Sequence, residues 1–340
     1  MAVQEKLPSK GAVLITGGAG YIGSHMVRSI LGKGISPIIF DNLSIGHEEF
    51  VPEGVPFYRG DLRNYDQIRQ AFHRHSIESV VHFAACALVG ESTENPLKYY
   101  ENNVLGSINL IKAMIENGVR NIVFSSSCSV YGNQTNDHIR EEDPLRPVNP
   151  YGRTKLMVEQ IISEVAHKEN LAYIFLRYFN VAGAHSSENI GEWHSPETHL
   201  IPNILSAAFR KTTPFSLYGN DYPTPDGTCI RDYVHVEDLC QAHLKALTAL
   251  QNESARNEAF NLGSGCGYSI LEVLESARRI SGVDIKTSVK ERREGDPPKL
   301  VASNDKAREK LSWEPRRNLE DMIRSAWRWT ATMGSKGLIA

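Results

Sequence analysis

A glycine-rich turn near the start of the chain constrains its fold more than any other stretch. Residues 11–16 (Gly-Ala-Val-Leu-Ile-Thr) form a short apolar run that predicts a β-strand. Gly17, Gly20 and Gly23 follow it at once, and a helical pattern then runs over residues 25–31. In a strand–turn–helix unit such glycines permit a tight turn, a close approach of pyrophosphate to the backbone, and packing of the helix on the strand. We therefore expect a dinucleotide at this helix N-terminus; a plain glycine-rich turn is the alternative.

Strand and helix patterns continue to alternate as far as residue 180. Further strands are expected at residues 35–40, 55–59, 79–83, 121–124 and 171–178, with helices at 65–75, at 95–117 and from residue 151 onward. This alternation predicts an α/β fold, with a doubly wound parallel sheet of the Rossmann type. The sequence after Asn180 is richer in loops. We expect residues 1–180 to form the dinucleotide-binding domain that carries the catalytic residues, and 181–340 a smaller C-terminal α/β lobe. Some segments of that lobe are expected to return to the first domain.

An acidic residue stands at the end of the second predicted strand. Asp41 follows Gly23 by eighteen residues, where a carboxylate binds the adenosine ribose hydroxyls and repels the extra phosphate of NADP. We therefore expect NAD as the cofactor, with a simple loop-capping role for Asp41 as the alternative. Asp61 and Leu62 follow the third predicted strand, where they are expected to lie against the adenine.

Tyr151 and Lys155 form the candidate catalytic pair. They stand four residues apart in a run without helix breakers after Pro150, so both side chains project from one helix face. A phenol with a pKa of ~10 is a poor base at neutral pH. A fixed ammonium beside it favours the phenolate, which makes Tyr151 a candidate general acid/base for a sugar or alcohol hydroxyl. The alternative is an ordinary exposed helix pair.

Polar residues near other strand ends add to the predicted site. Ser125 and Ser127 follow the fifth predicted strand, at the sheet edge where doubly wound folds bind ligands; a solvated serine turn is the alternative. Asn102 or its neighbour Asn103 is expected to hydrogen-bond the cofactor loop, and a cap-like structural role is the alternative.

The charge pattern favours a small phosphorylated ligand over nucleic acid. The net charge is −3 with acidic and basic residues interspersed, so no basic stripe suggests nucleic-acid binding. Arg231 and Arg293, in the second half of the chain, have the chemistry to neutralise a diphosphate through forked hydrogen bonds. Surface salt bridges are the alternative for both.

Several features are missing from the sequence. It has no run of eighteen apolar residues, its first ten residues lack an apolar signal core, and its five cysteines include no CxxC pair. Its twelve histidines form neither HxxxH nor HExxH. We therefore expect no membrane span, no disulfide framework, no metal site and a cytoplasmic location.

Taken together, motifs along nearly the whole chain resemble the UDP-glucose 4-epimerase family of extended short-chain dehydrogenases/reductases. They lie at residues 16–25 (TGGAGYIGSH), 41–43 (DNL), 89–92 (VGES), 124–127 (FSSS), 151–160 (YGRTKLMVEQ), 176–180 (LRYFN), 219–223 (GNDYP), 226–228 (DGT), 231–233 (RDY) and 293–296 (REGD). The resemblance covers about residues 11–330. It implies NAD-dependent 4-epimerisation of a UDP-sugar, above all UDP-glucose and UDP-galactose, by hydride transfer through a 4-keto intermediate.

The resemblance also implies residue roles. Tyr151 acts as the base, Lys155 binds the nicotinamide ribose and lowers the pKa of Tyr151, and Ser127 hydrogen-bonds the sugar C4 oxygen. With the reasoning above, the expected cofactor-binding residues are Gly17, Gly20, Tyr21, Ile22, Gly23, Asp41, Asn42, Asp61, Leu62, Phe83, Ala84, Ala85, Asn102, Ser125, Tyr151, Lys155 and Phe179. The expected substrate-binding residues are Ser127, Tyr151, Asn180, His199, Leu200, Ser216, Leu217, Tyr218, Arg231, Tyr233, Arg293, Asp296 and Leu300.

Some positions depart from the family pattern. Ala87 replaces a lysine that often reaches the NAD phosphates, and His199 lies where the family has asparagine, which puts its diphosphate contact in doubt. Leu300 replaces a bulky tyrosine at the sugar pocket, so N-acetylated sugars have room to enter. A UDP-N-acetylglucosamine or UDP-pentose 4-epimerase is therefore the alternative substrate assignment.

Other classes were weighed against the same residues. Nucleotide-sugar dehydratases and UDP-glucuronate decarboxylases carry acidic residues where this chain has Cys128 and Ser129, which disfavours both. A non-catalytic NAD-binding regulator would not need Ser127, Tyr151 and Lys155 together. The family commonly forms homodimers, and we expect the same here through the helices at residues 95–117 and 151–168.

Overall fold

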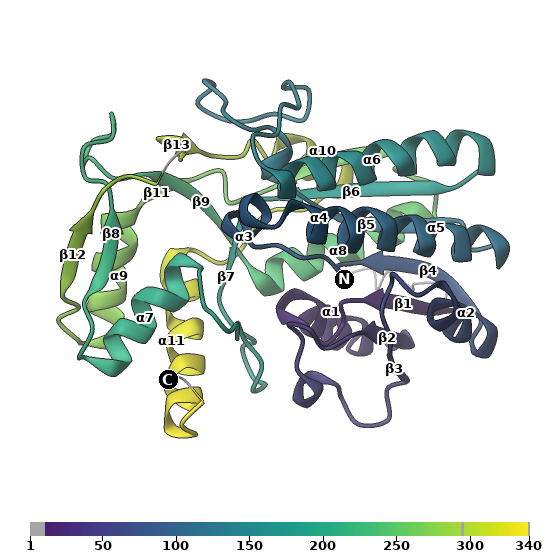
Figure 1. Cartoon of the computed structure of the whole chain (residues 1–340), viewed down its shortest axis with the longest axis horizontal. Helices are drawn as coiled ribbons and strands as arrows, with labels where there is room; N and C mark the ends of the chain where they lie inside the picture. Colours follow the sequence, from purple (N-terminus) through teal and green to yellow (C-terminus); the bar gives the residue numbers. More distant parts are fainter. Residues whose placement is uncertain (1–10, 294–295, 339–340) are drawn as a thin grey trace, which may run out of the picture. The chain divides into compact units, whose positions relative to one another are not determined.

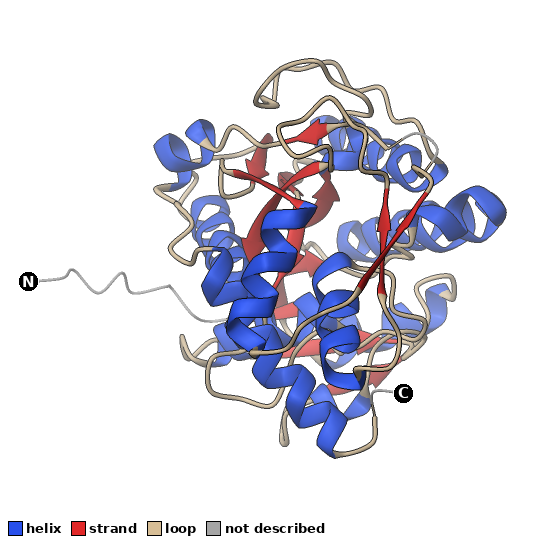
Figure 2. Ribbon diagram, turned by 90° about the vertical axis from the view of Figure 1, so that its left-hand side faces the viewer, coloured by secondary structure: helices blue, strands red, loops and turns tan. Residues whose placement is uncertain are grey.

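The computed structural model describes residues 11–293 and 296–338. The polar first ten residues, and Glu294 and Gly295 of the predicted arginine motif, lie outside the described residues. Helices and strands are both abundant in the part that is described (Figure 2).

A seven-stranded parallel sheet takes six of its strands from residues 12–178 and the seventh from residues 258–262. Its strands are β1 (Ala12–Thr16), β2 (Pro37–Asp41), β3 (Phe57–Arg59), β4 (Ile77–His82), β5 (Asn121–Ser127), β6 (Ala172–Tyr178) and β10 (Glu258–Leu262). Their order is β10-β6-β5-β4-β1-β2-β3, and Figure 1 labels every strand of this order except β10. The first six follow the order 3-2-1-4-5-6 of doubly wound dinucleotide-binding sheets, in which the winding reverses between β1 and β4. The predicted fold class is confirmed.

Helices between these strands follow the predicted alternation. They are α1 (Tyr21–Leu31), α2 (Tyr65–Arg74), α3 (Val89–Glu94), α4 (Pro96–Tyr99), α5 (Gly106–Glu116), α6 (Pro150–Glu169) and α8 (Val236–Gln251). Apolar residues of α2, α5 and α6 pack with alternate residues of the strands in one core, which includes Leu14, Ile38, Val80, Ile122, Ile68, Leu110 and Ile162. Because strand side chains alternate between faces, the intervening residues point to the other face.

The predicted long helix over residues 95–117 differs in detail from the structure. The chain is helical from Pro96 to Glu116, but residues Tyr100–Leu105 between α4 and α5 form a π-helical stretch. Asn102 and Asn103 lie inside it. Such π turns insert extra backbone length into a helix and are frequent at functional sites.

The described chain divides into two compact units. Unit 1 comprises residues 11–126, 149–176 and 240–259; unit 2 comprises residues 127–148, 177–239 and 260–338 without 294–295. The chain crosses between them inside β5, β6, α8 and β10, and once more between residues 148 and 149, just before α6. The crossing in β6, after Leu176, lies four residues before the domain limit predicted at residue 180.

Unit 2 contains two further sheets and four helices in its described part. β7 (Asn180–Ala182), β11 (Gly267–Ser269) and β13 (Lys299–Leu300) all pair with β9 (Ile230–His235), and β8 (Phe215–Tyr218) pairs with β12 (Thr287–Lys290). The helices are α7 (Leu200–Arg210), α9 (Ile270–Ser281), α10 (Asp305–Leu311) and α11 (Leu319–Ser335). Apolar residues of α7, α9 and α11 form its core beside β8 (Figure 1). In the described residues, no helix has both the length and the apolarity that crossing a membrane requires.

Candidate active site

The glycine turn between β1 and α1 has the form that the sequence predicts. Gly17 has a φ of +72°, and a Cβ there would lie 2.8 Å from the backbone nitrogen of Ala84. A Cβ on Gly23 would lie 2.0 Å from the carbonyl oxygen of Gly17. Gly20 precedes α1 and supplies no side-chain cap, while the first turn of any helix has N–H groups without intrahelical partners. These residues fit the phosphates of a dinucleotide.

Asp41 ties this turn to the end of β2. Its carboxylate accepts the backbone N–H of Ala19 at 3.0 Å and that of Leu43 at 2.8 Å. Burial raises the pKa of Asp41, and these hydrogen bonds oppose the rise. The capping role is therefore real. Because each carboxylate oxygen has two acceptor sites, the predicted contact with ribose hydroxyls is compatible with it and stays a prediction.

Two further predicted cofactor residues meet beside the ends of β2 and β3. The Asn42 side chain donates to Asp61 Oδ2 at 3.3 Å. Arg63 forms a two-point ion pair with Asp61 at 3.0 and 2.7 Å, and this pairing lowers the pKa of Asp61 to about 2. Asp61 therefore stays ionised, while the adjacent Leu62 is buried in the core.

Tyr151 and Lys155 lie on the same face of α6, as their spacing predicts. Asn149 caps the helix by accepting the N–H of Gly152 at 2.8 Å, and Pro150 occupies its first turn. Tyr151 is 8% exposed and Lys155 is 4% exposed, so the alternative of an ordinary exposed pair is wrong. The Lys155 ammonium nitrogen lies 5.8 Å from the centre of the Tyr151 ring.

The ammonium of Lys155 is held at the end of β5. It donates to the carbonyl oxygen of Ser125 at 2.8 Å. An ammonium has three N–H donors, so two remain for a ligand. Burial lowers the pKa of Lys155 to about 7, and the charge of Glu159 opposes this shift.

Glu159 is a residue that the sequence reasoning missed. It lies one helical turn after Lys155, is 3% exposed, and accepts the hydroxyl of Ser126 at 2.5 Å. The signal available was the series 151, 155 and 159, which places three polar side chains on one helix face. Glu159 thus connects α6 to β5 and supports the positive charge of Lys155.

The serines at the end of β5 are buried. Ser125 and Ser126 are 0% exposed and Ser127 is 7% exposed, so the alternative of a solvated turn is wrong. In unit 2, the Ser127 hydroxyl accepts the N–H of Ser129 at 3.2 Å and caps a short 3-10 turn, Cys128–Val130.

Asn103 makes the hydrogen bonds to the loop after β4. It accepts the N–H of Cys86 at 2.8 Å and donates to the Cys86 carbonyl and to the Thr154 hydroxyl, both at 3.0 Å. Asn102 donates to Asn103 at 3.0 Å. Asn103 thereby joins the loop after β4 to the helix turn between Tyr151 and Lys155.

His82, at the end of β4, is a second residue that the sequence reasoning missed. Its two ring nitrogens lie 2.7 Å from Thr16 Oγ1 and 2.8 Å from Ser107 Oγ. Burial lowers its pKa to about 3, and Lys155 adds to the shift. A neutral His82 therefore connects β1, β4 and α5 beneath the glycine turn.

The remaining predicted cofactor residues occupy several elements. Phe83 contacts the ring of His243 at 4.7 Å between centroids. Tyr21 and Ile22 open α1, Ala84 and Ala85 are half-buried after β4, and Phe179 is buried in unit 2.

In unit 2, β9 gathers several predicted substrate residues. Arg231 donates to Asp296 Oδ1 at 3.1 Å and to the Pro297 carbonyl at 2.8 Å, and Leu300 is its register partner on β13. The salt-bridge alternative is thus partly right for Arg231, although its side chain is only 13% exposed. The Asn180 side chain donates to the Asp232 carbonyl at 3.0 Å.

The other predicted substrate residues of unit 2 are spread over β8, β9 and α7. The Arg293 guanidinium lies 4.2 Å from the centre of the Tyr218 ring. Ser216 and Leu217 lie on β8, Tyr233 is buried in β9, and His199 and Leu200 stand at the start of α7. Sequence and fold together thus provide a base, a dinucleotide turn and a separate set of diphosphate-compatible side chains.

Comparisons with known proteins define the class to which this chain belongs. Residues 13–263 match the NAD dependent epimerase/dehydratase family, and the chain is a member of that family. Its relatives include the UDP-glucose 4-epimerase of Lactobacillus helveticus, which is 47% identical over 318 residues, or 93% of this chain and 96% of the relative. The predicted family resemblance is confirmed.

Solved structures agree with this assignment. A crystal structure of a UDP-glucose 4-epimerase matches with a TM-score of 0.93 at 47% identity, over 95% of this chain and 98% of the other. The UDP-glucose 4-epimerase of Brucella ovis in complex with NAD matches with a TM-score of 0.91 at 43% identity, over 94% and 98% of the two chains.

Proposed function

We infer that this protein is an enzyme that uses NAD to 4-epimerise a UDP-sugar, with UDP-glucose and UDP-galactose as its main substrates. The observation that carries this inference is the buried Tyr151–Lys155 pair on α6, which hydrogen-bonds the end of β5 in a sheet that also carries the glycine turn. The family match and the near full-length relatives support the same reaction.

Each catalytic side chain has a separate task. NAD, held by the glycine turn and Asp41, would supply the hydride acceptor for sugar C4 and the hydride donor that reduces the 4-keto sugar on its opposite face. Tyr151 removes the proton from the C4 hydroxyl and gives it back to the C4 oxygen. Lys155 stabilises the phenolate and uses its two remaining N–H donors for ribose hydroxyls. Ser127 donates a hydrogen bond to the C4 oxygen.

We assign the two ligands to different units. Unit 1 holds NAD through the glycine turn and Asp41, which excludes the phosphate of NADP. Unit 2 holds the UDP group, with Arg231 and Arg293 facing the diphosphate charge. The partial burial of Arg231 supports this role, because forked hydrogen bonds from a shielded guanidinium are stronger than those at a surface.

Leu300 supports a wider substrate range than UDP-glucose and UDP-galactose. It is half-buried and in register with Arg231, and it is smaller than the tyrosine common in the family. UDP-N-acetylglucosamine is therefore the second candidate substrate, with UDP-pentoses third.

The test is to incubate the purified protein with each UDP-sugar, with and without added NAD, and to identify the products. We expect conversion of UDP-galactose to UDP-glucose, lowered by roughly 10²–10⁴-fold in Tyr151→Phe. Tyr99→Phe is the matched control, because Tyr99 shares the buried cluster of Tyr151 and Cys86. Undiminished epimerisation by Tyr151→Phe contradicts the assignment of the base.

We also propose a homodimer formed through the helices of unit 1. Large apolar side chains are exposed on these helices: Val89, Leu97, Leu105, Ile108 and Met157, with Leu97 at 72%. They come from α3, the helical run from α4 to α5, and α6, which pack against one another. An apolar surface of this kind marks an interaction site.

Sedimentation velocity tests the homodimer at micromolar concentration. We expect a dimer for the natural chain and a monomer for Leu97→Glu. Leu31→Glu, at an exposed apolar position on α1, is the matched control and is expected to stay dimeric. We further propose a cytoplasmic location, which the five free thiols support because reducing compartments keep cysteines unpaired.

A further inference from the structure

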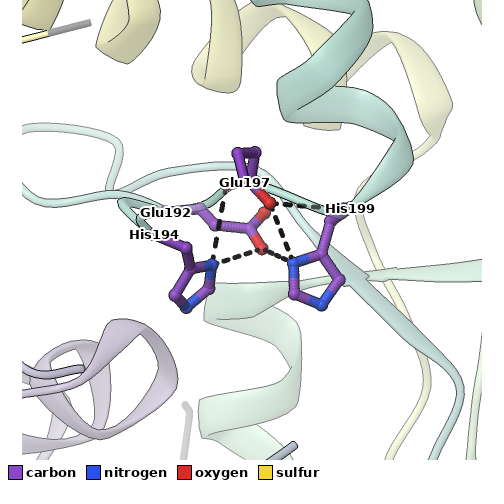
Figure 3. Close-up of side chains that lie close together, drawn as sticks. All are labelled: Glu192, His194, Glu197 and His199. Atoms are coloured by element: carbon purple, nitrogen blue, oxygen red, sulfur yellow. Dashed lines mark hydrogen bonds and ion pairs between the residues drawn. The ribbon is translucent and has the colours of Figure 1, made fainter. Parts of the chain in front are cut away.

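Four side chains between β7 and α7 of unit 2 converge on one point. Glu192, His194, Glu197 and His199, which we call the Glu/His cluster, each direct one ligand-type atom inward (Figure 3). These four atoms all lie within 4.8 Å of one another. No step of the proposed reaction uses the cluster as a whole.

The four distances between a histidine and a glutamate of the cluster are close to the spacing of ligands around a tetrahedral metal ion. His199 Nδ1 lies 2.8 Å from Glu192 Oε1 and 3.1 Å from Glu197 Oε1. His194 Nδ1 lies 3.4 Å from Glu192 Oε1 and 3.6 Å from Oε2, the other carboxylate oxygen of Glu197. Zinc bonds of about 2.0–2.2 Å place neighbouring tetrahedral ligands roughly 3.4 Å apart. The four contacts lie on both sides of this value, so small side-chain movements suffice.

Hydrogen bonding within the protein leaves part of the cluster unsatisfied. His194 Nδ1 is buried and makes no hydrogen bond of good geometry among the described residues, although Glu192 Oε1 lies 3.4 Å and Glu197 Oε2 3.6 Å away. A buried ring nitrogen without a partner is costly. A metal ion supplies the missing partner.

The charges of the two glutamates also favour a bound cation. The Glu192 side chain is 7% exposed and that of Glu197 is 19% exposed. Their ion pairs in the described chain are all with the two histidines. Two carboxylates and two neutral imidazoles around a divalent cation give a neutral site.

The surroundings orient the ligands. Glu197 Oε1 also accepts the N–H groups of Thr198 at 2.7 Å and His199 at 2.8 Å. The carbonyl of Glu192 accepts the indole N–H of Trp329, on α11, at 2.8 Å. Second contacts of this kind fix the direction of metal ligands.

We propose that Glu192, His194, Glu197 and His199 bind one zinc ion, which fastens the loop at residues 183–199 to the start of α7. Imidazole and carboxylate ligands suit zinc. Four protein ligands leave no open coordination position, which is typical of a structural zinc site rather than a catalytic one. The ligand spacing, Glu-X-His-X2-Glu-X-His, matches neither HxxxH nor HExxH, so the sequence alone did not indicate a metal site.

The test measures metal binding by the purified full chain, independently of any UDP-sugar reaction. After removal of metal with a chelator, zinc chloride is titrated in competition with a chromophoric chelator. We expect one zinc ion per chain, and a loss of about 100-fold or more in affinity for His194→Gln and for Glu192→Gln. His138→Gln is the matched control, because His138 is exposed and lies outside the cluster, and it is expected to bind zinc as the natural chain does.

Cobalt substitution tests the geometry without any variant. Co²⁺ in a tetrahedral site gives intense visible absorption, which we expect for the natural chain and not for His194→Gln. Circular dichroism establishes that each variant is folded. If the natural chain binds no zinc, gives only the weak spectrum of octahedral Co²⁺, or binds zinc as His194→Gln does, the cluster is a set of ion pairs and the proposal is wrong.

Discussion

Lys155 in unit 1 and Asp232 in unit 2 are both buried charges, yet their surroundings differ. Lys155 is 4% exposed and uses one of its three N–H donors, toward the Ser125 carbonyl. Asp232 is 0% exposed and accepts four hydrogen bonds, two from Ser264 at 2.7 and 2.6 Å, one from Gly265 at 3.1 Å and one from Ala302 at 3.0 Å. An ionised carboxylate has about four acceptor sites, so Asp232 is saturated.

The difference in hydrogen bonding indicates that the charge of Lys155 is available to a ligand, whereas the charge of Asp232 stabilises the fold. Asp232 joins β9 to the segments at Ser264 and Ala302, and it has no capacity left for a substrate. Lys155 has two donors in reserve and a pKa lowered by burial to about 7. A ligand that offers hydroxyl oxygens completes its hydrogen bonding, which is the task proposed for the nicotinamide ribose.

The largest expected effect tests the reserve donors of Lys155. Lys155→Met removes the charge that stabilises the Tyr151 phenolate, so we expect epimerisation to fall by roughly 10²–10⁴-fold. The NAD-free protein is expected to unfold at the same temperature or higher at pH 7, because an ammonium that burial disfavours has been removed. Lys168→Met, on an exposed position of the same helix, is the control. If Lys155→Met lowers the unfolding temperature but leaves the rate of epimerisation unchanged, Lys155 serves the fold and not the ligand.

The second effect concerns the saturated carboxylate. Asp232→Asn places an amide group against donors that now lack an acceptor, so we expect a loss of about 2–4 kcal/mol in the free energy of unfolding. Urea denaturation measures it. Asp221→Asn, which alters the surface pair of Asp221 with Arg292, is the control and is expected to change stability little. If Asp232→Asn lowers the free energy of unfolding no more than Asp221→Asn does, the four hydrogen bonds to Asp232 do not stabilise the fold.

The smallest effect is a pH dependence caused by Lys155. Its pKa is about 7 in the folded protein, against an ordinary value of 10.5, so the unfolded chain binds more protons between these two pH values. Stability of the NAD-free protein is therefore expected to rise with pH from about 7 upward, by about 1–2 kcal/mol up to pH ~8.5 from this group. Thermal unfolding across this range measures the slope, and Lys155→Met is expected to reduce it. If stability rises as steeply with pH in Lys155→Met as in the natural chain, a group other than Lys155 causes the pH dependence.

Residues whose role depends on local chain geometry could be predicted from the sequence. Gly17 and Gly23 are required by a turn of a few residues, and Tyr151 and Lys155 share a face because a helix repeats every 3.6 residues. The doubly wound parallel sheet was likewise expected, because strands and helices alternate along the first 180 residues. The substrate roles of Arg231 and Arg293 depend on the family resemblance and remain proposals.

Residues whose role depends on distant partners could not be predicted. The structural role of Asp232 depends on the hydrogen bonds that its carboxylate accepts from Ser264 and Ala302, which are far away in the sequence. Some segments of the second lobe were expected to return to the first domain, but the sequence did not show that β10 is the one that joins the large sheet. The role of His82 could not be predicted, because nothing near it in the sequence shows that its ring nitrogens form hydrogen bonds with Thr16 and Ser107.

The sequence by itself determined the doubly wound architecture, the dinucleotide turn and the helix that presents the base, because steric demands and short periodicities act over a few residues. Only the tertiary structure decided which buried charges have donors in reserve and which are saturated, and that Glu192, His194, Glu197 and His199 converge. Burial and hydrogen-bond partners are properties of the folded chain, since they come from segments that meet only after folding.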